Sequence, residues 1–453
     1  MTLPDPTDVL PDPADVPRRE FVKAAVALGG TVGLSACLGA NEGEGSGDDD
    51  SVDPTSGDDL DGVPTGDPDS VPDRQHAWND SLPTDEHGNV KTPVHHVLRL
   101  VDLAIDVADP AEREEARERL SAALSDLESA FAWSNEGLLF TVGYSPAYFD
   151  RFDQPLPESV DLPEPTALTS LEDPAFDDAD ILVHLASDSP EALLAAEEAL
   201  FGAVDAANGV DVTDASDLFE EVDRRTGFLD AGLPREHRDV EGVPEDAPIP
   251  EGAPLFMGFA NGFAESQATE DRVTIAEGPF AGATTQHLST LQTQLNAWWD
   301  QENHHQRVAK MFSPTHAAED RVGEWGEELA EDPAVADLPD DAVEYARDEG
   351  VVGHAQKAAR AREDGDPILL RRDFPTTDGD HTGLHFLTLQ ESIADFVRVR
   401  EAMTGEDIAD DTGVGTRVNN GILQYVFVRR RGNYLVPPRE HRSLPTPDPK
   451  ADR

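Results

Sequence analysis

Histidines are the residues of this chain best suited to acid–base or metal chemistry, and the sequence holds 14 of them. His304 and His305 are adjacent, so on a helix they point in different directions and suit one metal ion poorly. A solvated helix face explains that pair as well. His95 and His96 are adjacent in a predicted strand and point to opposite faces of it. Neither pair therefore predicts a metal site by itself.

His354 has the most favourable surroundings of the histidines. It stands in Gly353-His354-Ala355-Gln356, and the pair Arg371-Arg372 begins 17 residues later. A lone histidine is more often a satisfied surface or core residue than a ligand. Only the pattern of the whole folded body supports His354 as a ligand.

Several other chemistries are excluded by motifs that the sequence lacks. The chain has no Gly-rich phosphate loop preceded by a strand, no Gly-x-Ser-x-Gly elbow and no His-Glu-x-x-His. Its one cysteine, Cys37, lies in an N-terminal targeting segment. A cysteine nucleophile or a zinc–thiolate site in the folded body is therefore excluded.

The stretch LFMGFANGF, residues 255–263, places an Asn-Gly pair between apolar residues. Asn-Gly suits a tight turn that needs positive φ, so Asn261 and Gly262 are explained by a turn alone. The alternative is that Asn261 lies where chemistry happens. The two interpretations are compatible, because a turn can also form the wall of a site.

In the first half of the body, apolar runs and caps predict β-α-β, a long irregular insertion, and then β-α. The predicted helices begin at the caps Asp109-Pro110 and Ser189-Pro190. The predicted strands are 94–101, 137–144 and 180–186.

The second half repeats this pattern more loosely. A helix is predicted over 294–305, and another over 392–403 that ends before Gly405. Strands are predicted over 283–291, 367–372, 383–389 and 421–428. The chain is therefore predicted to be α+β, with two ferredoxin-like domains whose antiparallel sheets pack together, like a dimeric α/β barrel.

The charge of the chain limits its partners. The net charge is −59, from 93 acidic and 34 basic residues, and only five of the basic residues are lysines. Such a chain repels nucleic acid and anionic lipid surfaces, so neither is an expected partner. Dense Asp and Glu with little Lys is typical of a protein that works in strong salt, where self-repulsion is screened.

The N-terminal residues resemble a targeting signal. Arg18-Arg19 precede a 13-residue apolar run, too short to span a bilayer, and Leu34–Cys37 resembles a lipobox. We expect export by the twin-arginine route and lipidation of Cys37, with the protein on the outer face of the cell membrane or extracellular. The expected divisions are a signal (1–37), an acidic disordered linker (38–90), two halves (91–250 and 251–440) and a tail (441–453).

The folded body resembles the dye-decolorizing (DyP-type) haem peroxidases. The resemblance covers nearly all of 91–440 in order, and no single motif carries it. It runs through the segments VHHVLRL, LLFTVGYSPAYFDRF, DDADILVHLASDSPEALLAA, LFMGFANGF, GHAQKAARAREDGDPILLRRDFP, GLHFLTLQESIADFVRVREAMTG and ILQYVFVRRRGNYLVPP.

The resemblance implies a haem b cofactor and a set of site residues. His354 matches the proximal histidine, which ligates the haem iron, and Arg371 matches the distal arginine, which contacts cofactor and substrate. LFMGFANGF falls on the family's Gly-x-x-Asp-Gly signature, which gives roles to Gly258 and Gly262. Arg307 matches a basic residue near the haem propionates, although Gln306 replaces the glycine that usually precedes it.

The departure from the family lies at Asn261, where the signature carries an aspartate. A carboxylate can accept and return the proton that hydrogen peroxide must move, whereas an amide can only position water or peroxide by hydrogen bonds. Asp373, two residues beyond Arg371, is a substitute on the same strand face.

Three functions remain open from the sequence. The first is a DyP-type peroxidase that reduces hydrogen peroxide and oxidises a small-molecule electron donor. The second is an exported haem-binding lipoprotein for haem or iron handling, and the third is a binding module without haem. In each case we expect membrane contact only through the lipid anchor, and homo-oligomerisation is left open.

Overall fold

The computed structural model describes residues 60–202, 204–330 and 342–450. The twin-arginine segment, the lipobox with Cys37 and residues 38–59 lie outside the described residues, so these predictions stay predictions. Within the described part of the chain, no helix is long and apolar enough to cross a membrane.

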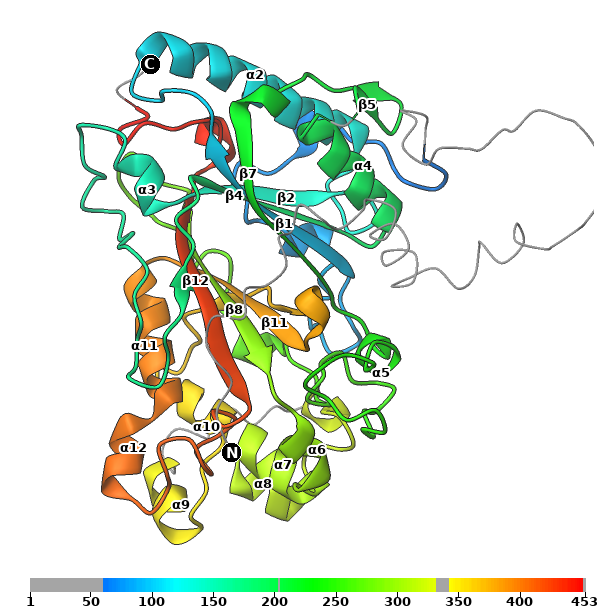
Figure 1. The fold of residues 1–453 in the computed structure, drawn as a ribbon, viewed down its shortest axis with the longest axis vertical. Helices are drawn as coiled ribbons and strands as arrows, with labels where there is room; N and C mark the ends of the chain where they lie inside the picture. Colours follow the sequence, from blue (N-terminus) through cyan, green and yellow to red (C-terminus); the bar gives the residue numbers. More distant parts are fainter. Residues whose placement is uncertain (1–59, 203, 331–341, 451–453) are drawn as a thin grey trace, which may run out of the picture.

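The first half forms the upper part of the molecule (Figure 1). Its main elements are β1 (His95–Leu103), α2 (Pro110–Ala130), β2 (Leu139–Tyr144), β4 (Ile181–Ser187), α4 (Pro190–Leu200) and β7 (Phe219–Phe228). Shorter elements are α3 (Pro146–Phe149), β3 (Ala175–Phe176), β5 (Ala206–Ala207) and β6 (Val210–Asp211), and α5 (Leu233–Glu236) lies lower, beside the second half (Figure 1). The predicted caps are confirmed, since Asp109 accepts hydrogen bonds from Ala111 N and Glu112 N, and Ser189 accepts one from Ala192 N.

The second half forms the lower part (Figure 1). Its strands are β8 (Thr284–Thr293), β9 (Leu370–Arg371), β10 (Phe374–Thr376), β11 (Gly383–Gln390) and β12 (Val426–Val436). Its helices are α6 (Asn296–Asp300), α7 (His304–Met311), α8 (Pro314–Glu319), α9 (Ala342–Asp348), α10 (His354–Ala359), α11 (Ile393–Thr404) and α12 (Glu406–Asp411).

The two halves have the same strand order, and the predicted α+β class with two ferredoxin-like sheets is confirmed. The order in space is β10-β11-β8-β12-β2-β4-β1-β7. Within each half, the first strand lies between the third and fourth, and the second strand pairs with the third. This is the order of a β-α-β-β-α-β unit. The division predicted at 250/251 falls between β7 and β8 and stays a prediction.

The joined sheet curls until its two ends meet. In the middle of the sheet β12 pairs with β2 at Leu435 and Tyr144, which joins the two halves, and the end strands β7 and β10 contact each other. There Gly227 lies so close to Phe374 that a Cβ at Gly227 would stand 2.3 Å from the Phe374 ring. The inside of this barrel-like sheet is a separate core that includes Leu98, Leu288 and Leu387.

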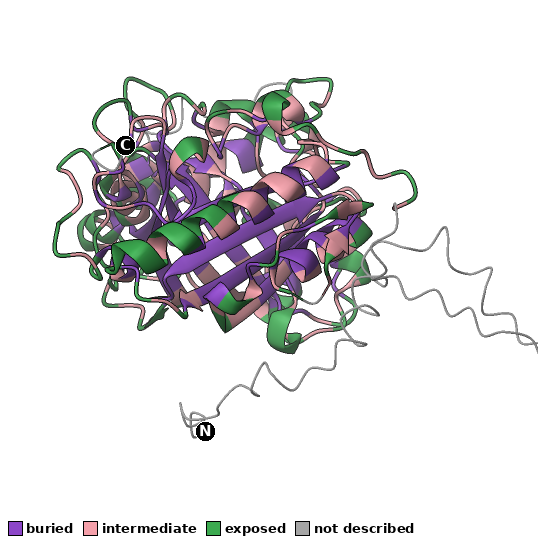
Figure 2. Cartoon of the chain, turned by 90° about the horizontal axis from the view of Figure 1, so that it is seen from above, coloured by how far each residue is buried: buried purple, intermediate pink, exposed green. Residues whose placement is uncertain are grey.

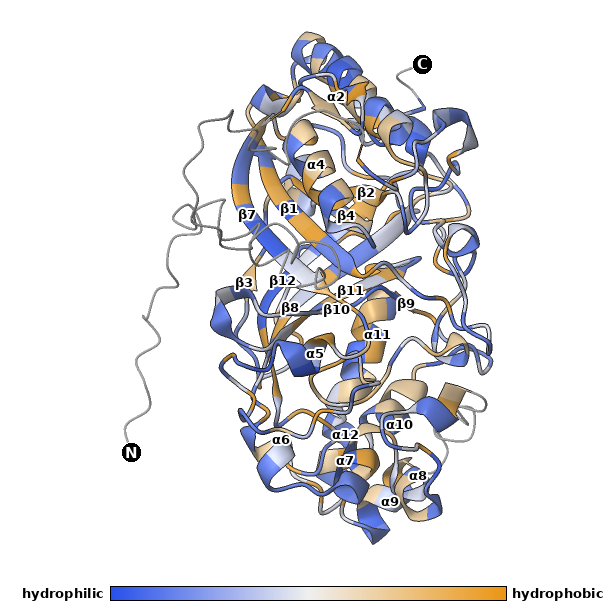
Figure 3. Cartoon of the chain, turned by 90° about the vertical axis from the view of Figure 1, so that its right-hand side faces the viewer, coloured by the Kyte–Doolittle hydropathy of each residue, from blue (hydrophilic) through white to orange (hydrophobic). Residues whose placement is uncertain are grey.

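Helices cover the outside of the sheet. Figure 2 shows α2 lying across buried strands, with its exposed residues turned outward. Figure 3 shows the same contrast in hydropathy, because β1 and β2 are largely hydrophobic while α2 is largely hydrophilic on its outer side. The core under α2 and α4 therefore holds the first half together, and α11 covers the corresponding face of the second half.

Three element predictions in the second half need correction. The helix predicted over 294–305 is two short helices, α6 and α7. Asn303 and Gln306 break it, because they form a capping box that begins α7. The strand predicted over 421–428 begins only at Val426, and the one predicted over 367–372 is limited to Leu370–Arg371.

β7 was not predicted. Its sequence, FEEVDRRTGF, carries charges where an alternating strand would carry apolar residues. The structure explains this, because Arg225 lies in a buried ion pair with Asp177 at 2.7 Å and Arg224 pairs with Glu197 at 2.6 Å. Ion pairing in the interior hides the strand pattern.

The predicted linker and tail are both shorter than expected. Residues 60–90 pack against the body, where Trp78 is fully buried with Leu139 and Ala186. At the other end, Tyr144 donates a hydrogen bond to Arg442 O at 2.6 Å, and Leu444 is buried. Both segments therefore belong to the folded body as far as the structure describes them.

The buried histidines predict a loss of stability in acid. His96 lies inside the barrel, where its Nδ1 hydrogen-bonds His184 Nε2 at 3.0 Å, and burial lowers its pKa to about 3. As pH falls from 6.5 toward 3, His96 binds a proton in the unfolded chain but stays neutral in the folded chain, so unfolding becomes more favourable. The stability advantage of the wild type over His96→Gln is expected to shrink by up to about 1.4 kcal/mol per pH unit in this window, measured by urea unfolding. A constant difference would contradict the assignment.

Candidate functional site

A largely apolar cavity of about 310 Å³ lies in the second half, between the sheet, the 255–263 loop and helices α10 and α11. Its volume is within the range of pockets that hold small molecules and cofactors. The polar and charged side chains in its wall are Asn261, Ser266, Ser289, Thr293, His316, His354, Arg362, Arg371, Asp373, Arg400 and Arg431.

His354 reaches this cavity from the first residue of α10. Gly353 precedes the helix and packs so tightly against Phe312 O that a side chain there would stand 1.8 Å away. Burial, and then the charges of Lys357 and Arg371, lower the pKa of His354 to about 3. The imidazole is therefore neutral at neutral pH. Among the described residues no hydrogen-bond partner of its ring is found, so a ring nitrogen is available to a ligand in the cavity.

Lys357 lies one turn after His354 and is fully buried. Its ammonium donates to Asn420 Oδ1 at 2.6 Å and to Asn420 O at 3.1 Å, and it makes no salt bridge among the described residues. Burial lowers the pKa of Lys357 to about 7. The neighbourhood of His354 on this side is thus cationic or neutral rather than acidic.

The 255–263 loop brings Asn261 to the cavity wall. Phe256, Phe259 and Phe263 are buried in the surrounding core and anchor the loop, and Gly258 N donates to Leu255 O to close a turn. Gly258 has φ +80°. The predicted turn is therefore present, and it also forms part of a cavity.

Arg371 enters the wall from β9, and two residues just after the loop fix its position. The side chain of Gln267 accepts from Arg371 N at 2.9 Å and donates to Arg371 O at 3.1 Å, so it clamps the backbone on both sides. The guanidinium donates to Ser266 Oγ at 2.9 Å. It forms no salt bridge among the described residues, so its charge is available to a ligand.

Asn261 and Asp373 meet in the cavity wall. Asn261 Nδ2 donates to Asp373 Oδ2 at 2.7 Å. Asp373 is buried, and burial raises the pKa of its carboxyl group, while the charge of Arg371 and the hydrogen bond from Asn261 act in the opposite direction. In the sequence, Asp373 was a candidate only because it lies two residues beyond Arg371. The structure adds its direct contact with Asn261.

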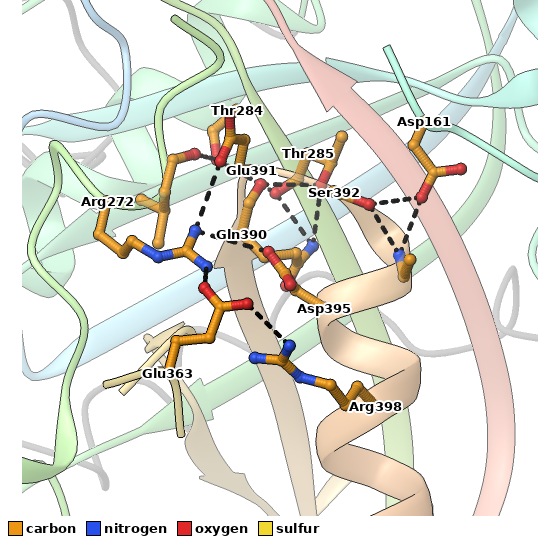
Figure 4. Close-up of polar contacts among 12 residues, drawn as sticks. Asp161, Arg272, Thr284, Thr285, Glu363, Gln390, Glu391, Ser392, Asp395 and Arg398 are labelled. Atoms are coloured by element: carbon orange, nitrogen blue, oxygen red, sulfur yellow. Dashed lines mark hydrogen bonds and ion pairs between the residues drawn. The ribbon is translucent and has the colours of Figure 1, made fainter. Parts of the chain in front are cut away.

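Arg362 is a second cavity arginine without a carboxylate partner among the described residues. It donates to the backbone carbonyls of Gly365 at 3.0 Å and Glu265 at 2.7 Å. The loop that carries it is tied down next to it, because Glu363 accepts from Arg272 at 2.7 Å and from Arg398 at 2.8 Å (Figure 4). The ion pairs of Glu363 thus fix the loop and leave the charge of Arg362 unneutralised.

The remaining predicted residues are not in the cavity wall. Arg307 lies outside it, with its guanidinium 4.6 Å from the centre of the Trp299 ring and a hydrogen bond to Glu302 O at 2.6 Å. Gly258 and Gly262 shape the loop through φ values of +80° and +79° and do not line the cavity. The structure therefore brings together His354, Asn261 and Arg371, and it places Arg307 elsewhere.

Sequence reasoning missed Lys357, Arg362, Gln267 and His316. Lys357 could have been singled out from the sequence, because the chain has only five lysines and this one lies three residues after the candidate metal ligand His354. Arg362 and Gln267 act through contacts between segments about 100 residues apart, which no local pattern reveals.

These residues fit a haem group. The cavity is largely apolar, His354 offers a neutral imidazole, and Arg362 and Arg371 offer unpaired cations for two carboxylates. Among the described residues, no group of three or more His, Cys, Asp or Glu side chains could hold a bare metal ion.

The chain matches one family model and several solved structures. A model described as a family of unknown function (DUF7405) matches residues 93–438. No curated protein matches the chain. Two solved structures, both variants of DypB from Rhodococcus jostii RHA1 in complex with heme, share 13% and 12% identity with TM-scores of 0.51 and 0.50; they cover 81% of this chain and 98% and 97% of their own.

A third solved structure is an encapsulated DyP-type peroxidase from Mycobacterium smegmatis. It shares 15% identity over 82% of this chain and 100% of its own, with a TM-score of 0.49. At such identities the likeness to the two DypB structures shows the fold alone.

Proposed function

Since the chain belongs to the family of unknown function DUF7405 and has the fold of heme-binding DypB, we propose that it is a haem-dependent peroxidase of the DyP type. It reduces hydrogen peroxide and oxidises a small-molecule electron donor. The cofactor is haem b, and its iron ligand is His354.

One observation carries this proposal. A single cavity is lined by a neutral, unpartnered imidazole and by a guanidinium that no carboxylate of the described residues neutralises. Arg371 is partly buried at this apolar wall, where an anionic ligand would pair with its charge. A flat apolar cofactor with two carboxylates and a metal matches both the apolar wall and these polar groups.

The roles of the chain's residues follow from their contacts. His354 would hold the metal, and Arg362 and Arg371 would pair with the carboxylates. Bound haem would supply the redox chemistry. Arg371, held by Gln267 and Ser266, stays cationic and stabilises negative charge that develops on peroxide. Arg307, placed outside the cavity, has no role in this proposal.

The second function, exported haem binding with little turnover, is favoured by Lys357. A histidine that ligates a metal usually donates its other N–H to a carboxylate, a carbonyl or water, which makes it a stronger ligand. Here the nearest buried charge is an ammonium. A cation at this place weakens electron donation by His354 and disfavours rapid cleavage of peroxide.

Export completes the proposal. The twin-arginine segment, the lipobox at Cys37 and the net charge of −59 support a lipid-anchored protein that works outside the cell in strong salt. Contact with the membrane would be through the lipid only, and nucleic acid is not a partner.

The test is a spectrum in high salt. The protein supplied with haem is expected to show a Soret band that His354→Ala loses and His305→Ala keeps, because His305 is exposed on α7. A wild type without a Soret band would overturn both haem functions. If haem binds but hydrogen peroxide changes neither the spectrum nor an added dye, the peroxidase proposal fails and the haem-handling function remains.

A further inference from the structure

The hydrogen-bonded pair Asn261–Asp373 lies in the cavity wall and could transfer a proton to or from a ligand. We propose that Asp373 is the proton-transfer carboxylate of this site and that Asn261 positions it, so that the acid–base group has moved from the 255–263 loop to the link between β9 and β10. This inference rests on the proposed peroxidase function and names the residue that handles the proton.

The contacts of Asp373 leave it able to act. Its carboxylate lines the cavity and accepts one hydrogen bond from Asn261 at 2.7 Å and one from its own backbone N–H. A carboxylate offers about four acceptor positions, so capacity remains for a ligand. No salt bridge to Asp373 is formed among the described residues, and a proton acceptor locked in an ion pair would be much weaker.

Burial supports the same role. The pKa of Asp373 is raised by burial, and the charge of Arg371 and the hydrogen bond from Asn261 moderate the shift. An acid–base group works best when its pKa approaches the working pH, because it then both accepts and returns a proton readily. Arg371 ends β9 and Asp373 follows two residues later, so the charge-stabilising group and the acid–base group come from one short stretch of chain.

Asn261 is explained by this arrangement. An ionised carboxylate only accepts hydrogen bonds, so the amide must turn its Nδ2 toward Asp373. Its Oδ1 is then turned away and can accept from a ligand O–H. The amide thus fixes the carboxylate and orients the ligand without transferring a proton.

The proton balance is closed within the pair and the ligand. Asp373 takes a proton from one oxygen of hydrogen peroxide and returns it to the other oxygen. That second oxygen leaves as water when the O–O bond breaks, and Asp373 is ionised again. The two electrons that the cleavage needs would be supplied by bound haem, and the donor would restore them.

Cyanide provides a test that does not depend on turnover, because hydrogen cyanide must give up its proton to bind. Haem-loaded Asp373→Asn is expected to keep its Soret band and to bind cyanide about 10²- to 10⁴-fold more slowly than the wild type. The control is Asp364→Asn, since Asp364 is exposed and its φ of +51° is tolerated by asparagine; it should match the wild type.

A double swap, Asn261→Asp with Asp373→Asn, keeps one carboxylate and one amide in contact. It is expected to recover most of the cyanide rate lost in Asp373→Asn. An Asp373→Asn protein that binds cyanide at the wild-type rate overturns the inference. If that variant cannot hold haem, the double swap decides: a rate near the wild type supports the inference and a slow rate overturns it. Failure of the proposed function is distinct, because the wild type itself would then show no Soret band or no response to peroxide.

Discussion

Gly353→Ala is expected to abolish haem binding and to destabilise the protein by about 3 kcal/mol or more. A Cβ at Gly353 would stand 1.8 Å from Phe312 O and 2.4 Å from Phe312 C. Both are backbone atoms at the end of α7, so no side-chain rotation can relieve the clash. α10 must move instead, and His354 is its first residue. Urea unfolding and a Soret titration with added haem measure the two effects.

The matched control for this prediction is Gly413→Ala. A Cβ at Gly413 meets no heavy atom within 4 Å, and its φ is not in the left-handed region. Its free energy of unfolding should stay within about 0.5 kcal/mol of the wild type, with haem binding unchanged. Equal unfolding midpoints for the two alanine variants would show that α10 tolerates a side chain before His354, and would contradict the expected displacement.

Elements built from local signals were predictable from the sequence. α2 begins at Pro110 because the side chain of the preceding Asp109 accepts hydrogen bonds from two N–H groups of the first turn. β1 and β4 are buried over nearly their whole length, so their apolar runs were visible. These signals depend on neighbours within a few residues.

Elements whose pattern depends on distant partners were not predictable. β7 reads as polar because its arginines find Asp177 and Glu197 in the folded state. Residues 60–90 read as a tether because their few apolar residues, among them Trp78, are separated by polar sequence. In both cases the compensating group lies elsewhere in the chain, and composition alone cannot supply it.

The candidate site divides in the same way. His354, Asn261 and Arg371 were predicted from a resemblance that runs through several segments in the same order along the chain. The structure places all three in one cavity wall. Arg307 was placed by its similarity to a single motif position, and its contacts with Trp299 and Glu302 hold it away from the cavity. Asn261 contacts Asp373, which lies 112 positions further along the chain. The effect on function of an asparagine at 261 therefore could not be predicted from the motif alone.

Arg371→Met is expected to lower the rate of reaction with hydrogen peroxide by about 10²- to 10³-fold while the Soret band persists. The guanidinium is aimed by Ser266 and its backbone by Gln267, and no carboxylate of the described residues draws its charge away. Removing it takes away the cation that stabilises negative charge on peroxide, whereas His354 still holds the cofactor. Stopped-flow spectra of the haem-loaded protein mixed with peroxide in high salt measure this rate.

Two variants define what Arg371 contributes. Arg371→Lys keeps the charge and loses the planar fork that reaches Ser266, so we expect a rate between those of the wild type and Arg371→Met. Arg429→Met removes an exposed arginine from β12 and should leave the rate unchanged. If Arg371→Met reacts as fast as Arg429→Met, charge stabilisation belongs to another cation of the cavity wall. Arg362 would then be the first to replace, because among the described residues its guanidinium donates only to backbone carbonyls, those of Gly365 and Glu265.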